Sequence, residues 1–311
     1  MSHNRNNWLD IAKGIAIILM VAGHTPIPGV VSHFIYAFHM PLFFIASGLV
    51  SNYEKYSLVD YIRHKLYTLL LPFICYSAIV ALLMYSVGEL DVMKLLKRGW
   101  GGYALWFVPV LFMACILVRI VFLTKKKNTR RFIMLCFLFI GYGLRHYEIS
   151  LPWNLSTVPY ASFLIMSGKE FASCKKRIEA PSHYWDILVL IIITTVISQF
   201  WRITGQFWRL DLAWNQITPI IPLTLGALAG TLMLFRLSVW IENKTKFIST
   251  ILQRVGRETY VVLAFSQITI MCINHFFTLN PLLKYGILVV VLILLKYLKD
   301  GINQLVKIKI L

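Results

Sequence analysis

The sequence contains few charged residues, and acidic residues are the scarcest of them. Only 14% of its 311 residues are charged, with 13 Asp and Glu against 31 Lys and Arg. Soluble globular domains carry about 25% charged and about 45–50% apolar residues. Here 58% of the residues are hydrophobic, and the mean hydropathy is +0.70. These values exclude a soluble enzyme, a secreted disulfide scaffold and a disordered nucleic-acid-binding chain, and they indicate an integral membrane protein.

Paired cysteines and metal-ligand spacings are also missing. The five cysteines show no CxxC or similar spacing, and four of them lie in apolar runs, which favours free thiols. The histidines at positions 24 and 39 have no third ligand at a metal-site spacing, so we expect no metal. The N-terminal run does not resemble a cleaved signal peptide, because Asp10 and Lys13 interrupt it.

Long apolar runs dominate what is present. They are continuous rather than alternating, so they predict helices and not strands crossing a bilayer. We predict an all-α, polytopic membrane helix bundle of about ten transmembrane helices, forming a single domain over residues 1–311. The predicted segments are 8–25, 31–52, 67–87, 103–123, 132–146, 155–168, 184–201, 217–238, 260–277 and 282–298.

The basic residues are distributed unevenly between the connecting segments. If the N-terminus is cytoplasmic, the inner segments hold 22 Lys and Arg and the outer segments hold 7. This asymmetry follows the positive-inside rule, so we predict that both termini are cytoplasmic. The same rule explains the net charge of +18 without nucleic acid as a partner; the lipid bilayer is the expected one.

The first apolar run carries three ionisable residues, Asp10, Lys13 and His24. Lys13 and His24 are eleven residues apart, which places them on one helix face about 16 Å apart along the axis. Asp10 lies within salt-bridge reach of Lys13. Because a buried lysine is costly in hydrocarbon, this face should point into the bundle or a cavity. Two simpler interpretations stay open: an interfacial pair with Lys13 snorkelling to the headgroups, and a helix-end histidine at the outer interface.

Three further polar positions lie within or beside the next two runs. His39 lies two residues before Pro41, which opens the helix where the freed backbone groups can line a cavity. A hydrogen bond between helices is the alternative role for His39. Arg63 and Lys65 precede the third run, and the positive-inside rule alone also explains their charge.

Tryptophans with polar neighbours mark the outer segments. Trp106 lies at the start of the fourth run, and Trp153 and Asn154 lie in an outer loop. The outer loop 202–216 adds Arg209, Asp211 and Trp214 among others. Aromatic faces beside polar groups suit sugar rings, although tryptophans of an interfacial belt give the same pattern.

Four motifs in order, LDIAKGIAIILMVAGH, FHMPLFFIASGL, RHKLYTLLLPF and LWFVPVLF, make the chain resemble membrane acyltransferase family 3. The likeness is greatest to its fucose 4-O-acetylase-like, polysaccharide O-acetyltransferase branch. The later VGRETYVVLAFSQ is similar to the final patterned segment of the family, and the resemblance covers most of the chain. The chain departs from the family in two places: many members have Arg in place of Lys13, and Ser266 occupies a position that is commonly histidine.

The resemblance implies a membrane-bound O-acyltransferase of the bacterial inner membrane. It would move an acyl group, most often acetyl, from cytoplasmic acetyl-CoA to a hydroxyl of a lipid-linked or surface carbohydrate such as O-antigen. His24 would act as general base, and His39 would orient it or bind the thioester oxygen. Lys13, Arg63 and Lys65 would hold the phosphates of CoA. The expected acceptor contacts are Asp10, Trp106, Trp153 and Asn154.

Two other functions are open at this point. A transporter or flippase could use Asp10, Lys13, His24 and His39 as a polar relay, although the sequence shows no internal repeat. A non-catalytic partner in polysaccharide assembly or export is the second. For the enzyme, the lack of a GxSxG elbow or a partnered cysteine favours direct transfer, with transient acetylation of His24 or His39 as the variant.

Overall fold

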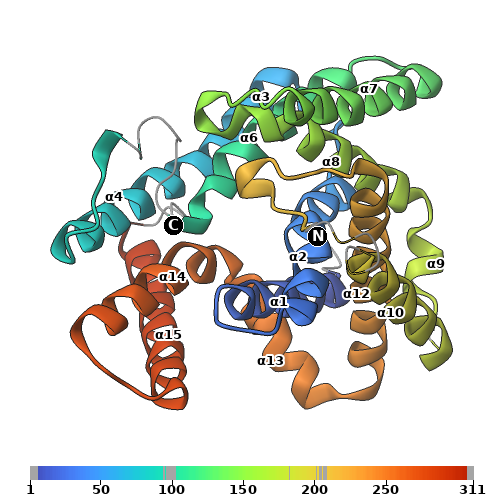
Figure 1. Ribbon diagram of the computed structural model, residues 1–311. Helices are drawn as coiled ribbons and strands as arrows, with labels where there is room; N and C mark the ends of the chain where they lie inside the picture. The colour runs from blue at the N-terminus through green and yellow to red at the C-terminus, as the bar shows by residue number, and fades with distance from the viewer. Residues whose placement is uncertain are drawn as a thin grey trace.

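The computed structural model describes residues 6–93, 95, 103–181, 183–200, 202, 205 and 209–306 (Figure 1). The longer helices are α1 (Asn7–Gly23), α2 (Gly29–Val50), α4 (Leu71–Ser86), α6 (Phe107–Val121), α7 (Lys127–His146), α8 (Val158–Ser173), α10 (Tyr184–Gln199), α12 (Ile220–Lys244), α13 (Lys246–Arg257), α14 (Thr259–Phe276) and α15 (Pro281–Val306). The short ones are α3 (Leu58–Lys65), the π-helical η1 (Leu66–Leu70), η2 (Tyr103–Trp106), η3 (Pro152–Thr157), α9 (Lys175–Glu179) and η4 (Leu212–Trp214). Within these ranges the only β pairing is an isolated bridge between Asp211 and Gln216.

Each of the ten predicted apolar segments coincides with a helix, but several boundaries differ; the sixth, 155–168, runs on to Ser173 and the tenth, 282–298, runs on to Val306. The third predicted segment, 67–87, begins earlier because α3 continues through η1 into α4. The fifth, 132–146, begins at Lys127, and the eighth, 217–238, runs on to Lys244. In each case the apolar run stops where polar residues begin, whereas the backbone hydrogen bonds continue into the polar turns.

Six helical segments of the described chain are long and apolar enough to cross a membrane: Gly29–Val50, Leu58–Ser86, Tyr103–Val121, Ile220–Lys244, Thr259–Phe276 and Pro281–Ile302. The last of these buries only 6% of its apolar window inside the protein. A helix so apolar and so little covered is suited to a lipid surface. The protein is therefore an all-α polytopic membrane bundle; the number of ten spans stays a prediction.

Helix α2 lies at the centre of the bundle, between α1, α8 and α12 (Figure 1). Its tightest crossing is with α8. A Cβ atom on Gly48 would lie 1.8 Å from the carbonyl oxygen of Ile165, and one on Gly168 would lie 1.9 Å from that of Ile45. Two glycines thus let the two backbones touch, which is the usual device for close helix packing in membranes.

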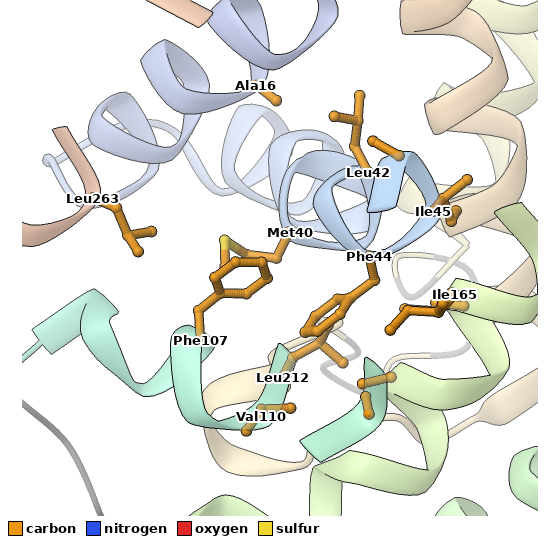
Figure 2. Close-up of a cluster of buried hydrophobic side chains, with 14 of the residues drawn as sticks. Ala16, Met40, Leu42, Phe44, Ile45, Phe107, Val110, Ile165, Leu212 and Leu263 are labelled. Atoms are coloured by element: carbon orange, nitrogen blue, oxygen red, sulfur yellow. The ribbon is translucent and has the colours of Figure 1, made fainter. Parts of the chain in front are cut away.

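The core around α2 is aromatic and aliphatic (Figure 2). Figure 2 shows Met40 and Phe44 of α2 beside Phe107 of α6, and the rings of Phe44 and Phe107 are 4.8 Å apart between centroids. Leu212, from the loop before α12, is 2% exposed and belongs to the same cluster. This loop is therefore part of the packed interior rather than a surface connection.

Helix α13 corrects the prediction of a loop over residues 236–259. Its apolar positions follow a helical period, and it packs against α1 through two glycines. A Cβ on Gly256 would lie 1.7 Å from the carbonyl oxygen of Asp10, and one on Gly14 would lie 2.2 Å from that of Leu252. The helix was missed because its polar face lowers its mean hydropathy, and an amphipathic period would have revealed it.

We name the two ends of the bundle for reference, after the topology predicted from the sequence. The basic end is where α1 begins and where α2 and α8 end; Lys169 of α8 donates to the carbonyl of Ser51 there, at 2.9 Å. The outer end is where α1 ends and α2 begins.

Candidate active site at the outer end of the bundle

Two of the predicted histidines meet at the outer end. His24 follows directly after α1 and is exposed, whereas His39 lies in α2 and is 3% exposed. The ring of Tyr36 lies between them, with centroid distances of 6.3 Å to His24 and 4.9 Å to His39. Tyr36 and His39 share a face of α2 because they are three residues apart. The structure thus brings His24 and His39 into one aromatic cluster.

The orientation of His39 is fixed by its own helix. Its Nδ1 lies 2.9 Å from the carbonyl oxygen of Ile35, one turn earlier. Because a carbonyl oxygen only accepts hydrogen bonds, Nδ1 is the donor. In the neutral ring this leaves the lone pair on Nε2, which can accept a proton or a hydrogen bond.

Arg209 completes the cluster from the loop between α10 and α12. Its guanidinium carbon lies 4.1 Å from the centre of the Tyr36 ring, and its Nη2 donates to Asp211 at 3.2 Å. The Nε atom of Arg209 is buried and has no acceptor among the described residues. Burial raises the pKa of Asp211, while Arg209 acts in the opposite direction. A positive group is therefore held rigidly beside the histidines, with one donor left over.

The loop that carries Arg209 is itself anchored. Asp211 exchanges two backbone hydrogen bonds with Gln216, at 3.0 and 2.8 Å, and its carboxylate accepts from the amide of Ala213. Thr157 and Asn154 donate to the carbonyls of Leu212 and Ala213, at 3.0 and 3.1 Å. Irregular backbone within a membrane bundle is tolerated only where protein satisfies its polar groups. These bonds do so, and they fix the position of Arg209.

One cavity opens beside this cluster, and a second cavity adjoins the first. One, of about 680 Å³, has Arg209 in its wall together with Arg145 and Glu148. The other, of about 570 Å³, shares Arg145 and Glu148 and is also lined by Asn154 and Trp214. The first is of a size that holds small ligands, and it lies one side chain away from the histidine cluster.

The predicted aromatic acceptor residues occupy different surroundings. Asn154 lines the second cavity, whereas Trp153 is 46% exposed and is absent from the lining of both cavities. Trp106 is only 6% exposed and packs edge-on against Phe107 in the core. The tryptophan that lines a cavity is Trp214, which is 54% exposed and comes from the same loop as Arg209.

The remaining predicted residues lie at the basic end, away from the histidines. Lys13 and Arg257 both pair with the buried carboxylate of Asp10, at 2.7 and 3.4 Å. Lys65 stands over the ring of Tyr61 at 5.5 Å, and Arg63 is exposed. α1 is one continuous helix from Asn7 to Gly23; it carries Lys13 and ends one residue before His24, which the predicted segment 8–25 included.

The sequence did not reveal which residues connect the two histidines into one site. The i, i+3 spacing of Tyr36 and His39 was a usable signal, but the contact of Tyr36 with Arg209 joins residues 173 positions apart in the sequence. Within the described ranges no group of three or more His, Cys, Asp or Glu side chains could hold a metal ion. The site therefore offers imidazoles, a guanidinium and two polar cavities.

Helices, cavities and ionisable groups together define an integral membrane protein with a polar, histidine-containing site inside its bundle. A family model described as an acyltransferase domain, that of acyltransferase family 3, matches residues 6–299. The chain belongs to this family of membrane acyltransferases. No curated protein matches the chain, and no solved structure does. The resemblance seen in the sequence motifs is thus confirmed at the level of the family.

Proposed function

We propose that the protein transfers an acetyl group from acetyl-CoA to a hydroxyl group of a carbohydrate, with the reaction at the outer-end cluster of His24 and His39. The observation that carries this proposal is the meeting of the two histidines on Tyr36, next to Arg209 and its cavity. Acyl transfer to a hydroxyl needs a base for the hydroxyl proton and a positive group near the developing oxyanion. Both kinds of group are present here within one cluster.

The chemical step uses His24 as the base. His24 takes the proton of the acceptor hydroxyl, and the hydroxyl oxygen attacks the thioester carbonyl carbon. The new C–O bond forms, the C–S bond breaks, and the CoA sulfur leaves with the proton that His24 held. His39, oriented by its bond to Ile35, accepts a hydrogen bond from protonated His24 through the lone pair of Nε2; it can donate to the thioester oxygen only as the imidazolium, when Nε2 carries a proton. Arg209 stands close enough to the cluster to favour negative charge in the transition state.

The donor enters from the basic end in this proposal. Asp10 is one carboxylate between two cations, Lys13 and Arg257, so this group keeps a net positive charge. Together with Arg63 and Lys65, these cations match the phosphates of CoA. The pantetheine arm then follows α1 from Lys13 to His24. This path gives a physical reason for placing a cation within α1 and a histidine directly after it.

The acceptor occupies the two cavities at the outer end. Asn154 lines one of them, and Trp214 offers an exposed aromatic face in the same wall. A sugar ring has an apolar face and hydroxyl edges, which such a wall accommodates. We place the acceptor here rather than at Trp106 or Asp10, because Trp106 packs in the core and Asp10 is paired with cations. A lipid-linked or surface polysaccharide, such as O-antigen in a bacterial inner membrane, fits this position.

The experiment compares surface glycans of cells carrying the intact gene, a deletion, or the deletion complemented with His24→Ala. Acetyl groups are located by NMR and mass spectrometry. We expect O-acetyl groups only with the intact gene, at one defined sugar position. His275→Ala is the control, because His275 is an exposed histidine in the last turn of α14. Unchanged acetylation combined with less surface glycan would contradict the proposal and favour a transporter or an assembly partner.

A further inference from the structure

A second polar cavity lies at the basic end, outside the site described above. Its volume is about 230 Å³, and it lies between the end of α6, the first turns of α7 and the last turns of α8. Four cations and one carboxylate line it: Lys127, Arg130, Arg131, Lys169 and Glu170. Phe122, Met134, Met166 and Ser173 complete the wall.

The carboxylate in this cavity is already engaged. Arg131 donates to both oxygens of Glu170, from Nη2 at 2.8 Å and from Nε at 3.4 Å. Among the described residues the other three cations form no ion pair with a carboxylate: Lys169 donates to the carbonyl of Ser51, and Arg130 donates to that of Lys125. Lys127 is exposed on the cavity wall, and its charge, like that of Arg130, acts on Glu170 through space. The cavity thus has three positive charges in excess.

Helix α7 begins at this cavity, and its first turn also favours a bound anion. The first turn of α7 contains no acidic residue, and no side chain caps its free amide groups. A helix N-terminus favours negative charge, so cations placed there are unfavourable by themselves. Helix α3 shows the ordinary arrangement, with Ser57 capping the amide of Asp60 in an acidic first turn. In α7 a bound anion would supply what Ser57 and Asp60 supply in α3.

The wall of the cavity is built to hold its cations in place. Arg130 stands over the ring of Phe122 at 4.7 Å, and Phe122 stacks on Tyr53 at 4.4 Å. Lys169 lies 5.8 Å from the same Tyr53 ring. Tyr53 in turn neighbours Tyr61, over which Lys65 stands. An arginine fixed by stacking loses less freedom when it binds an oxyanion.

From this geometry we infer that the cavity between α7 and α8 is a phosphate-binding site. The excess charge and the uncapped helix start select a phosphate group, which carries several acceptor oxygens and matches arginine geometry. Two sources present such a group at this end of the bundle: the 3′-phosphorylated nucleotide end of a CoA donor, and the headgroup of an anionic phospholipid. The site itself does not depend on acyl transfer; only the first source rests on the proposed function.

The test uses the full-length protein in phosphatidylcholine nanodiscs. The variant combines Lys127→Gln with Arg130→Gln. The matched control combines Lys125→Gln with Lys126→Gln, which removes the same charge from exposed neighbours that do not line the cavity. Adenosine 3′,5′-bisphosphate is the soluble probe, with titration calorimetry as the readout. The lipid arm adds phosphatidylglycerol to the nanodiscs and counts the phosphatidylglycerol molecules retained in native mass spectrometry, and thermal unfolding checks that each variant is folded.

Weakening of the nucleotide affinity by at least about tenfold in the variant, but not in the control, supports the site and assigns it to the nucleotide phosphate. Unchanged nucleotide affinity with fewer retained phosphatidylglycerol molecules supports the site and assigns it to a lipid. Equal behaviour of variant and control in both arms overturns the inference, because the charges would then serve topology alone. Neither arm measures transfer to a sugar, so failure here is distinguishable from failure of the proposed function.

Discussion

The outer and basic ends of the bundle differ in how their positively charged side chains are paired. At the outer end Arg209 is held between an aromatic ring and a carboxylate, on a loop anchored by backbone bonds. At the basic end the cavity of α7 and α8 gathers four cations around one carboxylate. The first arrangement orients one cation beside two imidazoles, and the second attracts an anion. Positive charge in a membrane protein therefore needs a local explanation as well as the topological one.

The largest effect we expect comes from the buried histidine of the outer end. His39→Ala should lower acetyl transfer by at least about a hundredfold, because general acid–base groups contribute on that scale. His33→Ala is the matched control, since His33 lies in the same helix and makes the same Nδ1 bond to a carbonyl one turn earlier. Initial rates with labelled acetyl-CoA give the comparison. Equal losses in both variants would show that His39 only supports the fold.

The next test concerns α2, the helix that connects the two ends, and its close packing against α8. Helix α2 carries His39 towards one end and Gly48 towards the other. Gly48→Ala should destabilise the protein by about 1–3 kcal/mol, because the new methyl group would meet the backbone of Ile165. Gly143→Ala is the control, since nothing lies within 4 Å of that Cβ position, and it should be neutral or slightly stabilising. Unfolding in detergent measures both; similar midpoints would contradict the close crossing.

A smaller effect separates the charge of Arg209 from its shape. Arg209→Lys keeps the charge but loses the planar stacking on Tyr36, so transfer should fall about tenfold. Arg209→Gln loses both and should fall further. A kinetic series of the three proteins tests this order. Full activity of the glutamine variant would remove Arg209 from the catalytic account.

The smallest effect is a pH dependence of stability. Burial raises the pKa of Asp211 and Arg209 opposes this. A carboxyl group with a raised pKa binds more protons in the folded state, so it lowers the free energy of unfolding as pH rises through that pKa. Without Arg209 the pKa of Asp211 is higher, so the pH range over which this carboxyl group lowers the free energy of unfolding extends to higher pH. The stability gap between wild type and Arg209→Gln should therefore widen by about 1 kcal/mol between about pH 4 and about pH 7. A constant gap would contradict the ion pair.

Much of the fold was predictable because membrane helices are recognisable in a sequence as long apolar runs. All ten predicted segments are helical, and Lys13 lies in the predicted first helix, α1, which ends one residue before His24. The family also followed from motifs in order, and the family match over residues 6–299 confirms it. Local hydropathy and helical period were enough for these inferences.

The joining parts of the site were not predictable in the same way. Arg209 contacts Tyr36 only because the irregular loop before α12 packs into the interior of the bundle, where Leu212 belongs to the core. Such a loop has no period, and its position depends on contacts with Thr157 and Asn154, more than fifty residues earlier. The tryptophans show the same limit: Trp106 and Trp214 look alike in sequence, yet one is in the core and the other lines a cavity.

The most direct test of the central claim is a transfer assay with purified protein. Protein in nanodiscs is incubated with acetyl-labelled acetyl-CoA and a membrane glycan extract, and label in the glycan is measured for wild type, His24→Ala and His275→Ala. We predict label in the glycan with wild type and His275→Ala, and a loss of at least about a hundredfold with folded His24→Ala. Full labelling by His24→Ala would contradict the account of the outer-end site.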